Sequence, residues 1–439
     1  MINIFLLLII ITNLLFTNIS FKVYKMKMNP MSLNSVWWTI NLIISSLGLY
    51  GMYKPSMMIY FIVFLATTAF NMGSLIRMNR TRVTIIGDDN FVGSVNYKKL
   101  IIINLVALIF IMPYTAKAVK ILVQSGPAVL RATSLTVGGL GTSMLTQVML
   151  EWIVTGVFNA TVIIAVILFT LNKNKNLMLL AILDIIIYTL TFSGRWILYR
   201  ALVVICISYI LLNGTKNKKF IIKDLNRERI LNDNQNTSKR KRKKSKRNLL
   251  LIISSSVVFL AIITFNRTFE GMSFFGNIVI YFTGSFVMLD SILSQNDFFS
   301  VNQWLFGGAS IAGITQPILA GFSFITGIEI VRADEIVLGI TALNYQIGEN
   351  IIFNAFATSN YMFIRDFGIL GCVVIPFVFG FVISGVYKKL IFKKRLFTYI
   401  LYVFLMYVII SSTMQWDFVS AWTWFAILFI YICIDQRKL

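Results

Sequence analysis

The chain contains no histidine among its 439 residues, only three cysteines, and 17 acidic residues against 40 Lys and Arg. Without histidine, the commonest general base and the usual zinc ligand are excluded. Cys206, Cys372 and Cys433 all fall in apolar runs, which predicts packing residues rather than a disulfide framework. No DxD or ExD carboxylate pair occurs. This argues against enzymes that hold a metal ion with such a pair.

What the chain has instead is apolar sequence: 57% of residues are hydrophobic and the mean hydropathy is +0.79. Runs of about 20 apolar residues are long enough to cross a bilayer as helices. The sequence therefore predicts an all-α polytopic membrane protein with about eleven transmembrane helices. They cover residues 2–19, 36–52, 56–76, 100–114, 149–171, 176–193, 196–213, 249–266, 367–387, 397–411 and 419–434.

The cationic residues alternate with these runs. Thirty-one of the forty fall in six short segments, which are 21–35, 77–99, 172–175, 214–248, 388–396 and 435–439. Positive charge accumulates on the cytoplasmic side of membrane proteins. One threading of the chain puts all six segments there, which predicts an external N-terminus and a cytoplasmic C-terminus. It also predicts two helical bundles, 1–213 with seven helices and 249–439, joined by the basic cytoplasmic loop 214–248.

The first apolar run is not expected to be a cleaved signal peptide, since no basic residue precedes it and Lys22, Lys25 and Lys27 follow it. The net charge of +23 and the basic run 239–247 raise the question of nucleic acid. That run directly precedes an apolar run and has no aromatic residues within it. Contact with anionic lipid explains it better, so no nucleic-acid partner is expected.

A stretch of about 100 residues, 267–366, is predicted to lie outside the cell between helices 8 and 9. It holds eight of the nine acidic residues assigned to the outer face. Loops of this length are usually functional. Its apolar stretches 273–289 and 303–328 are interrupted by glycines and by Pro317, which favours interfacial or re-entrant helices. The alternative is one more pair of crossings, which gives thirteen.

Nine cationic residues lie outside the cytoplasmic segments: Lys54, Lys117, Lys120, Arg131, Arg195, Arg200, Arg267, Arg332 and Arg365. Most are arginines, whose planar guanidinium binds phosphate through two parallel hydrogen bonds. Ordinary surface charge is the competing explanation. A second outer segment, 114–148, contains the glycine-rich piece GGLGTS, which permits tight turns and is a weak signal for a phosphate loop.

Few charged residues fall within the predicted helices. Asp184 lies near the middle of the sixth helix, where a carboxylate is expected to be functional or paired. It is either protonated or hydrogen-bonded to an asparagine such as Asn159. Arg195 follows Gly194 at the head of the seventh helix, at the depth of lipid headgroups. Either Arg195 or Arg200 is placed to form a salt bridge with Glu151.

These features together resemble a known family. The number of helices, the large late outer loop, the Gly194–Arg195 pair and residues 354–387 (NAFATSNYMFIRDFGILGCVVIPFVFGFVISGVY) are similar to the Wzy-type repeat-unit polymerases. The Asp366-Phe367-Gly368 step followed by Gly371 is the most specific part. The resemblance implies a GT-C-like architecture in a bacterial plasma membrane. It also implies polymerisation of undecaprenyl-diphosphate-linked oligosaccharides for O-antigen or capsule, with a flippase and a chain-length regulator as partners.

A mechanism is expected from this resemblance. Arg195 and Arg332 bind the lipid diphosphate, with Arg200, Arg267 and Arg365 as further candidates. Because histidine is missing, a carboxylate deprotonates the acceptor hydroxyl, and the candidates are Asp334, Glu335 and Asp366. No metal and no cofactor are expected, since converging arginines suffice for the leaving group. The stereochemical outcome, retaining or inverting, stays open.

Other functions compete with the polymerase. A flippase for the same lipid-linked sugars is expected to line its cavity with intramembrane charge, whereas here Asp184 is nearly alone. An O-antigen ligase is disfavoured because ligases of the related family use a periplasmic histidine. A membrane scaffold without catalytic activity is the third alternative.

Overall fold

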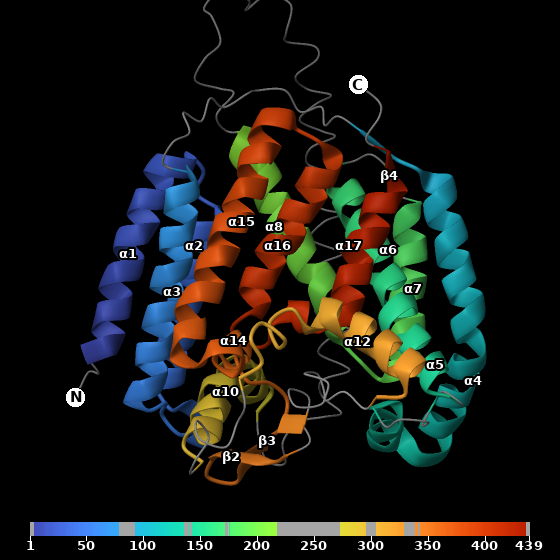
Figure 1. Cartoon of the computed structure of the whole chain (residues 1–439), viewed down its shortest axis with the longest axis horizontal. Coiled ribbons are helices and arrows are strands. Elements are labelled where there is room, and N and C mark those ends of the chain that lie inside the picture. Colours follow the sequence, from blue (N-terminus) through green and yellow to red (C-terminus); the bar gives the residue numbers. More distant parts are fainter. Residues whose placement is uncertain are drawn as a thin grey trace, which may run out of the picture.

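The computed structural model describes residues 4–78, 93–135, 140, 143–171, 174, 176–216, 273–295, 304–328, 339–340 and 343–435. Most of these residues are helical, and the helices stand side by side in a bundle (Figure 1). The predicted predominance of helix is confirmed. The sequence did not predict the four short strands, which form two antiparallel pairs, β1 with β4 and β2 with β3.

The helices follow one another as α1 (Ile4–Tyr24), α2 (Pro30–Ser46), η1 (Leu49–Gly51), α3 (Met57–Met78), α4 (Tyr97–Leu135), α5 (Met144–Val148), η2 (Met149–Val154), α6 (Thr155–Thr170), α7 (Leu177–Phe192), α8 (Trp196–Lys216), α10 (Phe274–Leu293), α12 (Ala312–Thr326), α14 (Ser359–Phe367), η3 (Gly368–Leu370), α15 (Gly371–Lys393), α16 (Leu396–Ser411), η4 (Asp417–Val419) and α17 (Ala421–Cys433). The strands are β1 (Ser94–Val95), β2 (Tyr345–Gly348), β3 (Ile351–Phe353) and β4 (Ile434–Asp435).

Six helical stretches of the described chain are long and apolar enough to cross a bilayer. They are Ile4–Tyr24, Met57–Met78, Tyr97–Pro127, Leu145–Thr170, Phe275–Leu293 and Ser359–Lys393. Helices suit a membrane because they satisfy their own backbone hydrogen bonds. The protein is therefore embedded in a membrane. Five shorter apolar helices accompany the six, and the predicted crossing at 249–266 lies outside the described residues.

The second helix differs from its predicted bounds of 36–52. Asn29 and Ser32 form a reciprocal capping box, and Pro30 occupies the first turn, so α2 begins six residues earlier. The helix ends at Ser46. Gly48, with φ of 60°, then turns the chain into η1. The capping residues thus determine where α2 begins, and the apolar run continues past the end of the helix.

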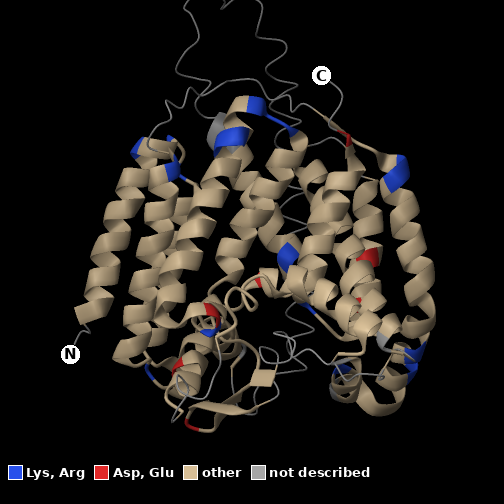
Figure 2. Ribbon diagram, viewed as in Figure 1, with Lys and Arg blue, Asp and Glu red and all other residues tan. Residues whose placement is uncertain are grey.

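The bundle has two unlike ends. At the lysine-rich end, α1, α3 and α15 each close with a cation in the last turn, namely Lys22, Arg77 and Lys393. There β1 also pairs with β4. The opposite end, here called the loop end, carries α12 and the β2–β3 hairpin. Figure 2 shows Lys and Arg along the lysine-rich end, with others in the bundle and at the loop end, and most acidic residues away from the lysine-rich end. The N-terminus and the C-terminus lie at opposite ends (Figure 1).

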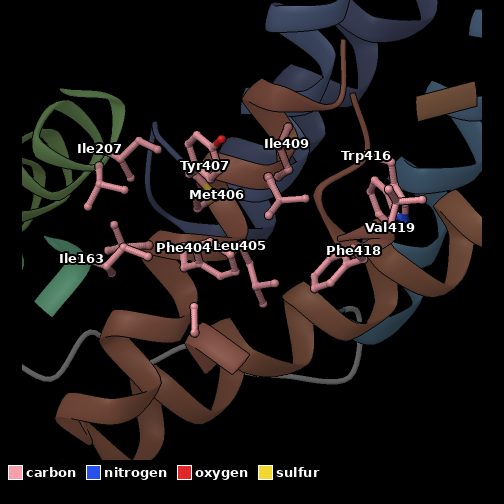
Figure 3. Close-up of a cluster of buried hydrophobic side chains, with 14 of the residues drawn as sticks. Ile163, Ile207, Phe404, Leu405, Met406, Tyr407, Ile409, Trp416, Phe418 and Val419 are labelled. Atoms are coloured by element: carbon pink, nitrogen blue, oxygen red, sulfur yellow. The ribbon is translucent and has the colours of Figure 1, made fainter. Parts of the chain in front are cut away.

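One hydrophobic core joins helices from both halves of the chain. α15 packs along α3, and Gly73 and Gly380 permit this because a Cβ on either would meet the backbone of the other helix. α6 is buried along nearly its whole length, between α4, α7, α8 and α17. The middle of the core is α16, whose Phe404 and Tyr407 lie close to Ile163 and Ile207 (Figure 3).

α10 forms hydrogen bonds with the residues that flank α16 and α3 at the loop end. Its Ser285 donates to the Thr413 carbonyl just after α16, at 2.7 Å. Its Asp290 accepts from the backbone N–H of Ser56, just before α3, at 2.7 Å. α12 lies beside the start of α17, where Gly313 packs on the Ser420 backbone. The two apolar stretches of the predicted outer loop are therefore helices at the loop end.

Candidate functional site

The connection between α7 and α8 presents Arg195 at the loop end. Ser193 ends α7 in a left-handed conformation, with φ of 50°, and reverses the chain. Gly194 follows because a Cβ there would lie 3.1 Å from the Tyr188 ring. Arg195 then immediately precedes α8, as the sequence predicted. A second cation holds this connection, since Arg131 Nη1 donates to the Phe192 carbonyl at 3.2 Å.

Arg195 lies against the ring of Tyr281, and two further aromatic rings pack beside it. Its Nη2 donates to the phenol oxygen of Tyr281 in α10 at 3.3 Å, and its guanidinium carbon is 5.7 Å from that ring's centroid. Beside it, the Trp196 and Phe356 rings are 5.5 Å apart, and Phe356 is 6.1 Å from Tyr281. All four residues are half-buried. This group, called the Arg195 cluster below, offers a partly exposed guanidinium beside aromatic faces.

Five residues further along α8, Arg200 is buried in an ion pair. Its Nη2 lies 3.4 Å from Asp417 Oδ1, and both side chains are essentially inaccessible. Its Nη1 donates to the Asn159 side-chain oxygen of α6. The guanidinium also stacks over the ring of Trp422, 4.0 Å from its centroid, and over Tyr407 at 5.1 Å. Five residues from α6, α8, η4, α16 and α17 thus form the Arg200 cluster.

Asp417 belongs to a buried, irregular connection between α16 and α17. Ser411 donates its hydroxyl to the second carboxylate oxygen, and the Thr423 hydroxyl donates to the Asp417 carbonyl at 2.7 Å. Next to it, Trp416 Nε1 donates to the Ser310 carbonyl at 2.8 Å. Irregular backbone at membrane depth is tolerated only where protein buries it. The connection is buried by the surrounding protein, and these hydrogen bonds hold Asp417 in place.

Tyr199 connects the two arginine clusters. Its ring centroid is 5.1 Å from that of Trp196 and 6.5 Å from that of Tyr407. The rings of Trp196, Tyr199 and Tyr407 therefore form a continuous series of contacts. Arg195, just before α8, lies near one end of this series, and Arg200 lies near the other. Because five residues turn the chain by about 140° beyond one full helical turn, Arg195 and Arg200 point to different sides and reach different partners. Arg200 pairs with Asp417, which was not among the predicted site residues. Of the two arginines considered as partners of Glu151, Arg200 is therefore engaged elsewhere.

Asp366 is fully buried and bonded by backbone. Its two carboxylate oxygens accept from the N–H groups of Ala309 and Ser310, each at 2.8 Å. Its carbonyl accepts from Phe306 N at 3.2 Å. Asp366 lies in the last turn of α14, and its carboxylate organises the turn that leads into α12. Both oxygens are thus engaged, which favours a structural role over that of a general base.

Of the remaining predicted site residues, one is buried and the others lie outside the described residues. Arg365 is buried beside Asp366, and its carbonyl accepts from Leu305 N at 3.0 Å. The others fall outside the described residues, as does most of the GGLGTS piece; they are Arg267, Arg332, Asp334 and Glu335. The structure thus brings Arg200 to Asp417, Arg195 to Tyr281, and Asp366 to residues 309–310.

Most members of these clusters were not among the predicted site residues. They are Trp196, Tyr281 and Phe356 around Arg195, and Asn159, Tyr407, Asp417 and Trp422 around Arg200. Asp417 was recognised only as an outer-face acid. A carboxylate between two apolar runs is a usable signal, because its burial requires a partner. Its separation from Arg200 by 217 positions gives no hint of which partner. The hydrogen bond expected between Asp184 and an asparagine is confirmed, but the partner is Asn104. Asn159, the example considered, binds Arg200.

No family model matches the chain, and neither a curated protein nor a solved structure matches it.

Proposed function

We propose that this protein is a membrane glycosyltransferase that joins undecaprenyl-diphosphate-linked oligosaccharide repeat units into O-antigen or capsular polysaccharide. The reaction takes place at the outer face of a bacterial plasma membrane, with the lysine-rich end of the bundle in the cytoplasm. The loop end then faces the compartment in which flipped lipid-linked sugars arrive.

The observation that supports this proposal most is the Arg195 cluster. A half-buried guanidinium at the loop end matches a lipid diphosphate, because the planar fork donates two parallel bonds to phosphate oxygens. The neighbouring faces of Trp196, Tyr281 and Phe356 suit the apolar faces of sugar rings. Diphosphate and sugar are adjacent in the substrate, as guanidinium and rings are in the cluster.

In the reaction, an acceptor hydroxyl oxygen bonds to the anomeric carbon of the growing glycan as the bond from that carbon to the diphosphate oxygen breaks. The leaving diphosphate keeps the electron pair, and Arg195 stabilises the charge that develops on it. The hydroxyl proton passes to a carboxylate and from there to water. Since Asp366 is held by two backbone N–H groups, Asp334 and Glu335 are the preferred bases.

Arg200 has a supporting part in this proposal. Asp417 balances its charge, and Trp422 covers its face, so it offers no open fork to a phosphate. Its ion pair instead fixes the first turns of α8 against α6, α16 and α17. That keeps Arg195 at a constant depth, which matters because a displacement of about 1 Å in a catalytic group costs on the order of 100-fold in rate.

A deletion strain tests the function through its glycan ladder. We expect long chains to disappear while single repeat units are still displayed, and the wild-type gene to restore the ladder. Accumulation of lipid-linked units inside the cell indicates a flippase instead. Free polymer on the lipid carrier with no attachment indicates a ligase, and an unchanged ladder indicates a protein outside this pathway.

The proposed sidedness has its own test. We expect a reporter inserted after Asn350, in the β2–β3 turn, to read as external, and one inserted after Lys394, between α15 and α16, to read as cytoplasmic. The reason is the positive-inside rule, since the lysine clusters lie at the α15–α16 end. Paired alkaline phosphatase and fluorescent-protein fusions measure this, and the reverse readings contradict the proposed location of the site.

A further inference from the structure

A third buried carboxylate, which belongs to neither arginine cluster, lies in the middle of the bundle. Asp184 of α7 is inaccessible to solvent, at the contact of α7 with α4 and α6. Asn104 of α4 and Thr161 of α6 are equally inaccessible and complete a three-residue group, called the Asp184 cluster. Each of three helices contributes one polar side chain to this cluster.

The hydrogen bonds of this cluster all come from one amide. Asn104 Nδ2 donates to Asp184 Oδ2 at 2.7 Å and to Thr161 Oγ1 at 3.0 Å, which uses both of its hydrogens. Two buried oxygens, Asp184 Oδ1 and Asn104 Oδ1, are left without a donor. Buried polar atoms are normally hydrogen-bonded, so the cluster lacks a donor. It does not lack an acceptor.

No positive charge among the described residues is bonded to this carboxylate. α6 has no titratable side chain between Thr155 and Thr170. α8 contributes Arg200, which is bound to Asp417 and Asn159. Its other titratable groups are Tyr199, Cys206, Tyr209 and, as its last residue, Lys216; α7 itself adds only Tyr188. The titratable groups of α4 lie toward its ends and in its outer half: Tyr97, Lys98, Lys99, Tyr114, Lys117, Lys120 and Arg131.

We propose that Asp184 is a proton-binding site, and that the folded protein in its membrane keeps this carboxyl protonated at neutral pH. The proton comes from water and no electrons are transferred. A carboxylate in a bilayer interior is costly without a counter-ion, and a neutral acid is not. The O–H also supplies the one donor that the Asp184 cluster lacks. The cluster then joins α4, α6 and α7 by hydrogen bonds without a buried charge.

Infrared spectroscopy tests this directly, with Asp184→Asn as the matched control because asparagine is neutral and of nearly the same shape. Both proteins, full-length and in lipid nanodiscs, are labelled with carbon-13 aspartate. At neutral pH we expect the carbonyl band of a protonated carboxyl in the wild type that shifts with the label and is missing from Asp184→Asn. Absence of that band from the wild type overturns the proposal.

Thermal unfolding as a function of pH provides a second readout that needs no activity. The folded wild type holds a proton that the unfolded chain releases, so its stability falls as pH rises. Above about pH 4, where an aspartate of the unfolded chain ionises, we expect its unfolding temperature to fall relative to that of Asp184→Asn, until the folded carboxyl ionises as well. Parallel profiles overturn the proposal. So does a wild-type stability that depends on sodium and loses this dependence in the variant, since that identifies a monovalent cation as the ligand.

If Asp184→Asn fails to fold, the pH titration of the labelled wild type decides alone. A carboxyl band that is present at neutral pH and gives way to a carboxylate band on alkalinisation supports the proposal. A carboxylate band already complete at neutral pH overturns it.

Discussion

Replacement of Arg195 by alanine abolishes long-chain glycan, while the protein still inserts and accumulates at its normal level. We expect this result because the proposed reaction develops charge on the diphosphate, and the Arg195 guanidinium is the described donor best placed to bind it. Loss of one such preorganised donor costs about 100- to 1000-fold in rate. The glycan ladder of a complemented deletion strain, read beside a membrane immunoblot, measures both quantities.

Two further variants make this test specific. Arg195→Lys keeps the charge but loses the planar fork, so we expect short chains and a rate between those of the wild type and the alanine variant. Lys120→Ala is the control, because it removes an exposed cation of α4 that does not belong to the Arg195 cluster. We expect it to leave the ladder unchanged. Normal chain lengths in Arg195→Ala would remove Arg195 from the mechanism.

Breaking the Arg200–Asp417 pair has the largest expected effect on stability. Arg200→Ala leaves Asp417 as a buried charge with its main partner gone, and Asp417→Ala leaves a buried guanidinium. Removal of one partner of a buried pair typically costs about 3–5 kcal/mol. We therefore expect either single variant to unfold at a much lower temperature in detergent, or to accumulate poorly. Fluorescence-detected unfolding of the purified proteins measures this.

The double variant Arg200→Met/Asp417→Leu distinguishes two causes of instability in the single variants. One is the unpaired buried charge, and the other is the loss of side-chain volume. Apolar replacement of both partners is often neutral, so we expect the double variant to be more stable than either single one. Additive losses would show that the two side chains act independently. Activity in the double variant reports on Arg200 separately: retained polymerisation supports its role in positioning α8, whereas loss in a stable protein indicates a direct part in the chemistry.

Local sequence predicted the helices well where length and polarity suffice. The apolar runs at 56–76 and 176–193 became α3 and α7 with bounds within a few residues. It failed at α2, where a capping box determines the start of the helix. It also underestimated α4, which begins at Tyr97, continues past the predicted end at 114 and is kinked at Gly126 before it ends at Leu135. Pro113 did not end that helix, because a proline inside an apolar membrane helix can be accommodated by its neighbours.

The candidate site was predictable only in part. Arg195 was identified from a Gly-Arg pair at a helix head, which is a local pattern. Tyr281 and Phe356, which complete its surroundings, come from α10 and from the segment after β3. Nothing in their own neighbourhoods marks them, since aromatic residues at such positions are usually core residues. The role of Asp366 was also hidden, because its partners are backbone N–H groups that any sequence supplies.

Composition and charge order by themselves determined that this chain is a helical membrane protein without histidine chemistry, with most of its described lysines at one end of the bundle. Those properties depend on the free energy of transferring each segment from water to lipid. That free energy is a sum of contributions from residues that are neighbours in the sequence. Tertiary structure alone decided that Arg200 pairs with Asp417, that Arg195 meets Tyr281, and that Asp184 is bonded by Asn104. Each of these contacts joins residues at least 80 positions apart. Burial makes such polar groups require partners, and only the packing of the helices determines which partner is within reach.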